Sequence, residues 1–349
     1  MRAMQPVPLH LRVQGAAGRA LLKLPRPALV RLSGGRRVTR DGCVLDEQLQ
    51  CMLFVAERLG RGLTDRGDVA AARAAMDLDA HVFAPPPAAL ASADDDRVRD
   101  DLNVRVYRPR DLAAPSPAVV FFHGGGFALG GLTSHDRVCR SLAHDARCVV
   151  ISVDYRLAPE HAFPAAADDA TEAFRWVIRE AARLGVDPAR VAVAGDSAGG
   201  NLAAVVALDT RADTQRPRLQ ALVYPVVDNT RSFPSARIMS EGFLLTEESI
   251  AWFRAQYVPD ASQWRHPRAS PWFAPDLAGL PPALVQTAGF DPLRDEGEAY
   301  ASRLRDAGVP VEARRYPSLI HGYLNLTGSV EAAREPWSDL VFALRGAFA

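Results

Sequence analysis

The chain has 349 residues, of which 48% are hydrophobic, and its 41 basic residues are balanced by 41 acidic ones. This length allows one large domain or two ordinary ones, and the apolar fraction suffices for a substantial core, which excludes overall disorder. The absence of net charge argues against a nucleic-acid-binding protein, and no apolar run approaches the length of a membrane span.

The first forty residues form a basic arm with no acidic residue before Asp41, and apolar residues are interleaved through it. Its basic residues are Arg2, Arg12, Arg19, Lys23, Arg26, Arg31, Arg36, Arg37 and Arg40. A lid segment and a contact with an anionic surface are the functional interpretations. The simpler interpretation, which we favour, is an arm that packs on its own protein with its arginines solvated.

Two helices are predicted after the arm. Asp46 is a candidate N-cap residue for the first, in which Leu49, Met52, Leu53 and Ala56 share one face. Asp68 is a candidate N-cap residue for the second, over 69–76. Three prolines at 85–87 exclude a helix or a central strand. We expect a linker there, extended by the acidic residues 94–96.

From residue 102 onward the pattern alternates between strands and helices. Strands are predicted over 104–107, 118–122, 148–153, 191–194, 221–224, 283–288 and 311–316, and helices over 165–184, 198–208, 294–307 and 330–348. Such alternation predicts an α/β fold with a mostly parallel sheet covered on both faces. The alternation breaks between 228 and 265, where Thr246 is a candidate N-cap residue of a helix in an insertion.

The segment Gly195-Asp196-Ser197-Ala198-Gly199 lies directly after a predicted strand and directly before a predicted helix. A serine on such a tight turn occupies a strained backbone position, for which the two glycines supply room. Backbone N–H groups at the helix N-terminus then point toward the serine's target. The pattern indicates a nucleophile. A plain glycine-rich turn is the alternative, and the strand before and helix after argue against it.

A second signal, His123-Gly124-Gly125-Gly126, follows the apolar strand predicted over 118–122. Successive glycines let the backbone approach a ligand and present N–H donors, which a tetrahedral intermediate needs at its oxyanion. A phosphate-binding loop is the alternative. The segment lacks both the Gly-Lys-Ser/Thr ending and the Gly-x-Gly-x-x-Gly spacing of such loops.

A serine alcohol needs a base, which a carboxylate in turn orients. His321 and Asp291 each follow one of the last two predicted strands, at the sheet edge where open α/β folds build their sites. The order Ser197, Asp291, His321 is that of an α/β-hydrolase. Asp295 and Glu296 are rival acids, but we expect both to cap or line the helix that follows.

The segment 154–160 carries Arg156 and Glu160 close to a proline turn. One interpretation gives Glu160 an acid role in catalysis. We prefer a structural one, in which the two opposite charges pair and lock this loop beneath the site.

Together these motifs resemble the hormone-sensitive lipase family of α/β-hydrolases, also called bacterial family IV esterases. The resemblance runs from about residue 104 to the C-terminus. It rests on His123-Gly124-Gly125-Gly126, Asp154-Tyr155-Arg156-Leu157-Ala158-Pro159-Glu160, Gly195-Asp196-Ser197-Ala198-Gly199-Gly200, Asp291-Pro292-Leu293-Arg294-Asp295 and His321-Gly322-Tyr323. Tyr323 stands where family members often carry Phe.

The resemblance implies a serine carboxylic ester hydrolase that works through an acyl-enzyme and needs no metal or cofactor. It implies Ser197 as nucleophile, His321 as base, Asp291 as orienting acid, and an oxyanion hole from the N–H groups of Gly125, Gly126 and Ala198. It also implies a catalytic domain over residues 98–349 with a helical cap. The cap consists of residues 1–80 and of an insertion in the catalytic domain at about 228–265. Because a roofed pocket restricts chain length, we expect short- to medium-chain acyl esters as substrates.

Two functional alternatives stay open. In the first, the same triad acts on an amide, a lactone or an acetylated small molecule. In the second, more remote one, the protein is a non-catalytic receptor on this fold, which the complete triad argues against. We expect a small-molecule ester as the partner and no nucleic acid, and we leave a homodimer and a peripheral membrane contact of the arm open. The four cysteines lack zinc-ligand spacing and favour a reducing cytoplasm.

Overall fold

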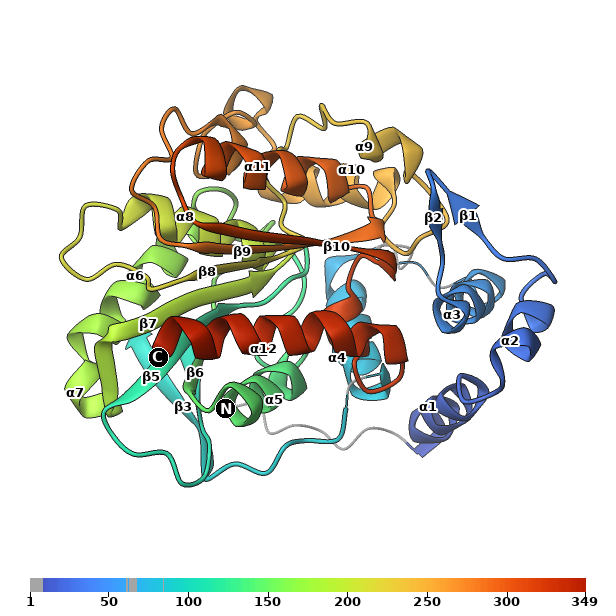
Figure 1. Ribbon diagram of the computed structural model, residues 1–349, viewed down its shortest axis with the longest axis horizontal. Helices are drawn as coiled ribbons and strands as arrows, with labels where there is room; N and C mark the ends of the chain where they lie inside the picture. Colours follow the sequence, from blue (N-terminus) through green and yellow to red (C-terminus); the bar gives the residue numbers. More distant parts are fainter. Residues whose placement is uncertain (1–8, 61, 63–67, 84) are drawn as a thin grey trace.

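An eight-stranded sheet runs through the centre of the protein (Figure 1). The computed structural model describes residues 9–60, 62, 68–83 and 85–349. The strands are β3 (Ser92–Arg99), β4 (Leu102–Arg108), β5 (Ser116–Phe122), β6 (Val149–Asp154), β7 (Val186–Asp196), β8 (Gln220–Val223), β9 (Ala283–Phe290) and β10 (Val311–Ile320). Their order is β10-β9-β8-β7-β5-β6-β4-β3. All pairings from β10 to β6 are parallel, and β4 and β3 form an antiparallel edge. The predicted, mostly parallel sheet is confirmed.

Helices cover both faces of the sheet and bury two apolar clusters against it. The helices are α5 (Asp136–Ala146), α6 (Ala165–Arg179), α7 (Ala181–Leu184), α8 (Ala198–Asp209), α11 (Arg294–Asp306) and α12 (Arg334–Phe348). Buried residues of α6, α8 and α11 share one cluster, and those of α5 and α12 share the other. Strands β5, β6, β8 and β9, and β7 from Val191 onward, are buried on both faces almost throughout, which explains their apolar sequences.

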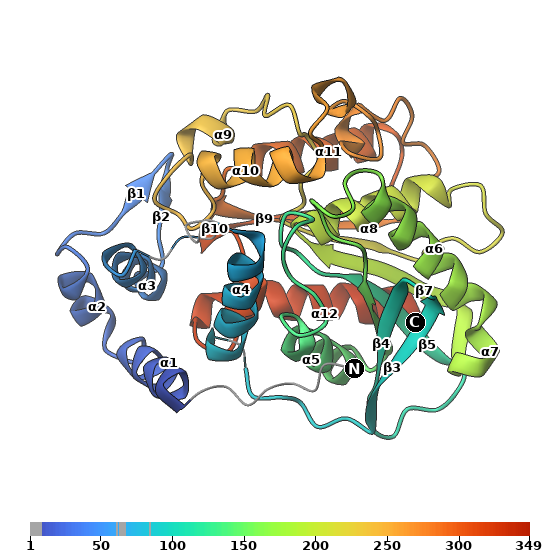
Figure 2. The same ribbon diagram turned by 180° about the vertical axis from the view of Figure 1, so that it is seen from behind.

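The N-terminal region forms helices that lie beside the carboxyl ends of the strands (Figure 2). They are α1 (Leu9–Leu21), α2 (Arg26–Leu32), α3 (Glu47–Arg58) and α4 (Val69–Phe83), with a small β1–β2 ribbon (Thr39–Arg40, Cys43–Val44). Asp46 accepts hydrogen bonds from the N–H groups of Gln48 and Leu49 at 2.8 and 3.2 Å, as predicted for an N-cap residue. Asp68 accepts one from Ala71. Residues 1–8 of the basic arm lie outside the described residues.

The insertion after β8 contains α9 (Ser235–Ile238), α10 (Glu247–Tyr257) and two 3₁₀ turns (Ala261–Gln263 and Pro271–Phe273). Thr246 begins α10 with a capping box shared with Ser249, as its sequence position predicts. Two further 3₁₀ turns, Tyr323–Leu326 and Glu331–Ala333, follow β10. Within the described ranges no helix is long and apolar enough to span a membrane.

Three predicted elements are wrong in detail. The acidic residues 94–96 belong to the edge strand β3, where Asp95 pairs with Arg105, rather than to a linker. Edge strands tolerate charged side chains because one side of the strand faces solvent. The helix predicted over 165–184 is broken by a turn at Glu180 into α6 and α7. The last helix begins at Arg334 rather than at 330, because Pro336 is tolerated only in a helix's first turn.

Candidate active site

Ser197 lies on the tight turn between β7 and α8, in a backbone conformation that residues other than glycine rarely adopt (φ 57°, ψ −117°). The turn is crowded: a Cβ on Gly195 would collide with the backbone of Gly199, and a Cβ on Gly199 with the carbonyl of Phe122. Glycine is therefore required at both positions, as predicted. Close packing around the turn keeps its backbone in this strained conformation and holds the serine side chain above the edge of the sheet.

Asp291 and His321 follow neighbouring parallel strands, whose register pairs Phe290 with Ile320. The two side chains therefore leave the sheet side by side. His321 Nδ1 lies 2.8 Å from Asp291 Oδ2, and its Nε2 lies 2.9 Å from Ser197 Oγ. A carboxylate only accepts, so Nδ1–H donates to Asp291 and Nε2 is left to accept the serine proton. Asp291 Oδ1 is fixed in turn by the N–H of Leu293 at 2.8 Å.

The glycine loop after β5 faces this trio of residues. Gly125 and Gly126 have φ values of 122° and 59°, which glycine adopts without strain. The carbonyl of Gly125 accepts hydrogen bonds from the two residues 128 and 129, which turn the loop back. Across the part of the chain described, the N–H groups of Gly125, Gly126 and Ala198 make no hydrogen bond. These N–H groups are thus available to a ligand beside Ser197.

Contacts between residues of three motifs support the loop from behind. Gly124 donates its N–H to Asp196 Oδ1 at 2.9 Å. His123 stacks on Tyr155 with ring centroids 4.2 Å apart, and the Tyr155 hydroxyl donates to the His123 carbonyl at 2.7 Å. Burial, together with the nearby imidazole of His135, lowers the pKa of His123 to about 3. His123 is therefore uncharged near neutral pH, and its contacts with Tyr155 hold the start of the loop in place.

A mainly apolar cavity of about 310 Å³ opens over Ser197. Its walls come from the N-terminal helices and from the insertion, through side chains such as Met52 on α3, Met76 on α4 and Phe253 on α10. A Cβ on Gly126 would collide with the Phe253 ring, so that ring lies directly against the glycine loop. The two segments that break the strand–helix alternation thus meet at one pocket.

The predicted pairing of Arg156 with Glu160 is wrong. Arg156 binds the buried Asp169 of α6, with Nη2 2.8 Å from Oδ1 and Nε 2.9 Å from Oδ2. Glu160 binds Arg73 of α4 at 2.7 and 2.8 Å, and this partner holds the pKa of Glu160 down to about 2. Arg73 also donates to the carbonyls of residues 128 and 158. Residues 73 and 160 are too far apart in sequence for their pairing to be predicted.

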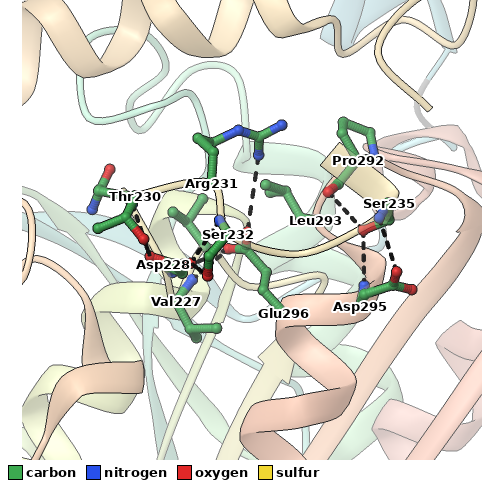
Figure 3. A network of polar contacts seen from close by, with 12 residues as sticks. Val227, Asp228, Thr230, Arg231, Ser232, Ser235, Pro292, Leu293, Asp295 and Glu296 are labelled. Carbon is green, nitrogen blue, oxygen red and sulfur yellow. Dashed lines mark hydrogen bonds and ion pairs between the residues drawn. The ribbon is translucent and has the colours of Figure 1, made fainter. Parts of the chain in front are cut away.

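The rival acids Asp295 and Glu296 lie in the first turn of α11, inside the helix as predicted. Both also bind the start of the insertion (Figure 3). Asp295 accepts the N–H of Ser235 at 2.8 Å, and Glu296 Oε1 accepts those of Val227 and Asp228 at 2.8 and 3.2 Å. Complete burial raises the pKa of Glu296 to about 8, although Arg231, with Nη1 3.9 Å from Oε2, opposes this. Neither carboxylate contacts His321, which leaves Asp291 as its partner.

The sequence patterns do not mark Phe253 or Tyr224 as residues of the site. The Tyr224 ring packs 4.6 Å from the His321 ring, and its hydroxyl accepts the N–H of Leu324 at 3.2 Å. Both aromatics belong to ordinary apolar runs, so no local signal marks them. Among the described residues, no group of three or more His, Cys, Asp or Glu side chains could hold a metal ion.

A serine on a strand-to-helix turn, with its histidine and carboxylate after later parallel strands, defines the α/β-hydrolase class. Residues 119–325 match the α/β-hydrolase fold family, and the chain belongs to it, within the hormone-sensitive lipase group of carboxylesterases.

Three of its relatives cover most of the chain. The carboxylic ester hydrolase LipN of Mycobacterium tuberculosis is 44% identical over 350 residues, 96% of this chain and 92% of LipN. The ethyl acetate hydrolase of Pseudomonas putida is 41% identical over 248 residues, 70% of this chain and 78% of that enzyme. The solved structure of a hyperthermophilic esterase from Pyrobaculum calidifontis superposes with a TM-score of 0.78 at 42% identity. It covers 85% of this chain and 98% of its own.

Proposed function

We propose that the protein is a serine hydrolase of carboxylic esters, with Ser197 as nucleophile, His321 as base and Asp291 as the acid that orients it. The observation that carries this proposal is the hydrogen-bonded series Asp291–His321–Ser197, at 2.8 and 2.9 Å, beneath an apolar cavity. The names of the relatives, a carboxylic ester hydrolase and an ethyl acetate hydrolase, support the same chemistry.

In the proposed reaction, Ser197 Oγ attacks the ester carbonyl while its proton passes to His321 Nε2. The oxyanion that forms accepts hydrogen bonds from the N–H groups of Gly125, Gly126 and Ala198. Loss of one such donor typically costs a factor of about 10² to 10³ in rate. His321 then protonates the leaving alcohol, and a water activated by the same histidine releases the acid from the acyl-enzyme.

We further propose short- to medium-chain acyl esters, roughly two to eight carbons, as substrates. Support comes from the mainly apolar cavity of about 310 Å³, whose walls include helices of the N-terminal region and of the insertion. A p-nitrophenyl ester series from acetyl to palmitoyl tests this range, and amide and lactone analogues in the same assay test the alternative substrates. Highest activity on palmitoyl esters would contradict the proposed range.

The triad is tested by substitution. Ser197→Ala and His321→Ala should each lower kcat by about 10⁴-fold or more, with a double variant little worse, because the residues act as a unit. Asp291→Asn should cost less, since the histidine stays in place but is misoriented. Ser262→Ala, at an exposed serine of the insertion, is the matched control. Substantial turnover by Ser197→Ala would overturn the proposed function.

Residues 1–80 and 228–265 are proposed to form the cap, and the arm within it to be part of this lid. Leu22 and Leu29 of the arm are buried against Cys51 of α3, and Leu22 also lines the cavity. Deleting residues 1–40 should therefore change KM or chain-length preference. Salt-sensitive binding of the full chain to anionic vesicles, with unchanged kinetics after truncation, would instead favour a membrane contact.

We also propose that the enzyme works in the reducing cytoplasm. All four cysteines are free thiols buried in the fold, as is usual where disulfides do not form. Fractionation of the native host's cells with an antibody to the protein would test this location.

A further inference from the structure

Behind the proposed nucleophile lies a buried carboxylate that catalysis itself does not use. Asp196 directly precedes Ser197 and is only 3% exposed. Its Oδ1 accepts the N–H of Gly124 at 2.9 Å, and its Oδ2 lies 3.4 Å from the hydroxyl of Tyr224. A Cβ at Gly124 would collide with this carboxylate, so the glycine loop rests directly on it. The position of Asp196 therefore sets the position of the loop.

A buried charge needs a partner, and that partner is His135. His135 is fully buried, precedes α5, and places Nε2 3.1 Å from Asp196 Oδ1. In the described part of the chain no other side chain forms an ion pair with Asp196. Burial opposes its ionisation, but the hydrogen bonds from His135 and from the N–H of Gly124 help to keep the pKa of Asp196 below its ordinary value.

The orientation of the His135 ring is fixed at its other nitrogen. Nδ1 lies 2.9 Å from Ser134 Oγ. The same oxygen accepts the N–H of Gly131 at 3.0 Å and lies 3.1 Å from the Gly131 carbonyl oxygen. Because a carboxylate only accepts, the proton on Nε2 must point at Asp196. The side chain of Asn325, 3.5 Å from Nε2, and the rings of His123 and Phe121 close the site.

We propose that His135 is a positioning residue for the oxyanion hole, holding Asp196, which in turn holds Gly124 and so the N–H groups of Gly125 and Gly126 opposite Ser197. His135 touches neither substrate nor the reacting atoms. Its effect passes through one carboxylate that lies next to the nucleophile on one side and supports the glycine loop on the other. The proposal rests on the proposed esterase function, because only that reaction needs the oxyanion hole.

The test compares three variants of the full chain. His135→Phe keeps a ring but loses the donor, His135→Gln keeps an N–H near the position of Nε2, and His144→Phe is the control. His144 lies on α5, the helix that His135 precedes, and is exposed. Active sites are first titrated with a fluorophosphonate, so that kcat for p-nitrophenyl butyrate is expressed per reactive Ser197.

We expect His135→Phe to lower kcat by about 10- to 100-fold with KM changed less than about threefold, because an oxyanion is bound only in the transition state. His135→Gln should stay within about threefold of the wild type. Inhibition by a trifluoromethyl ketone, which forms an oxyanion on the serine, should weaken by the same factor as kcat. If the phenylalanine variant does not fold, His135→Asn replaces it, because its shorter amide cannot reach Asp196.

Unchanged kcat per titrated site in His135→Phe, even with a lower melting temperature, would overturn the proposal and reduce His135 to a core residue. An equal loss in the glutamine variant would overturn it too, since the donor would then not matter. Failure of the esterase proposal itself looks different: Ser197→Ala would keep its activity, and no variant would respond to the ketone.

Discussion

Glu296 gives the sharpest prediction about stability. Its carboxyl group is completely buried under the insertion, where Oε1 accepts two backbone N–H groups and Oε2 has no hydrogen-bond partner in the described residues (Figure 3). Glu296→Gln keeps the accepting oxygen and the size of the side chain but can no longer ionise. The substitution therefore isolates the effect of a buried charge.

The magnitude follows from the pKa. Burial raises the pKa of Glu296 from an ordinary value of 4.5 to about 8, against the opposing effect of Arg231. The folded protein thus binds this proton more tightly than the unfolded chain does. Its stabilising contribution is full below pH 4.5 and is lost as the pH rises to about 8. At about 1.4 kcal/mol per pH unit, the whole interval corresponds to an upper limit of about 5 kcal/mol.

Urea unfolding of wild type and Glu296→Gln between pH 4.5 and 9, followed by tryptophan fluorescence, measures this contribution. We expect the two free energies of unfolding to be similar at pH 4.5, and the variant to become more stable by about 2 to 5 kcal/mol at pH 9. Glu248→Gln, at an exposed position of α10, should follow the wild type at every pH. A difference between wild type and Glu296→Gln that does not change with pH would refute the reasoning.

Two further predictions concern the pocket walls. Phe253→Ala should lengthen the preferred acyl chain by about two to four carbons in the p-nitrophenyl series, because the ring of Phe253 fills space against Gly126. Phe342→Ala, at an exposed aromatic residue of α12, is the control. An unchanged preference in Phe253→Ala, or an equal shift in the control, would contradict this prediction. Arg73→Ala should raise KM about three- to tenfold, because its guanidinium holds α4 to two carbonyls of the catalytic domain. The exposed Arg179→Ala is its control, and an Arg73→Ala variant with wild-type KM would show that α4 is held by apolar packing alone.

Much of the fold could be predicted from the sequence because its signals are local. Continuous apolar runs indicated the buried parallel strands, and Asp46 and Thr246 indicated where helices begin. The glycines around Ser197 indicated the tight turn, since only glycine fits where backbones nearly touch. The proposed triad residues also follow from chain order, because each one comes directly after a strand and parallel strands end at one edge.

The tertiary structure alone decided which charged and aromatic side chains meet. Arg156 pairs with Asp169 rather than with Glu160, and Glu160 pairs with Arg73, 87 residues away. Phe253 reaches the glycine loop, and Glu296 holds the insertion, from positions that look like ordinary helix residues. Local sequence patterns indicate where a segment can form a strand, a turn or the end of a helix. Pairings between distant side chains depend on how helices pack above the sheet, and that packing is set by shape and burial across the whole chain.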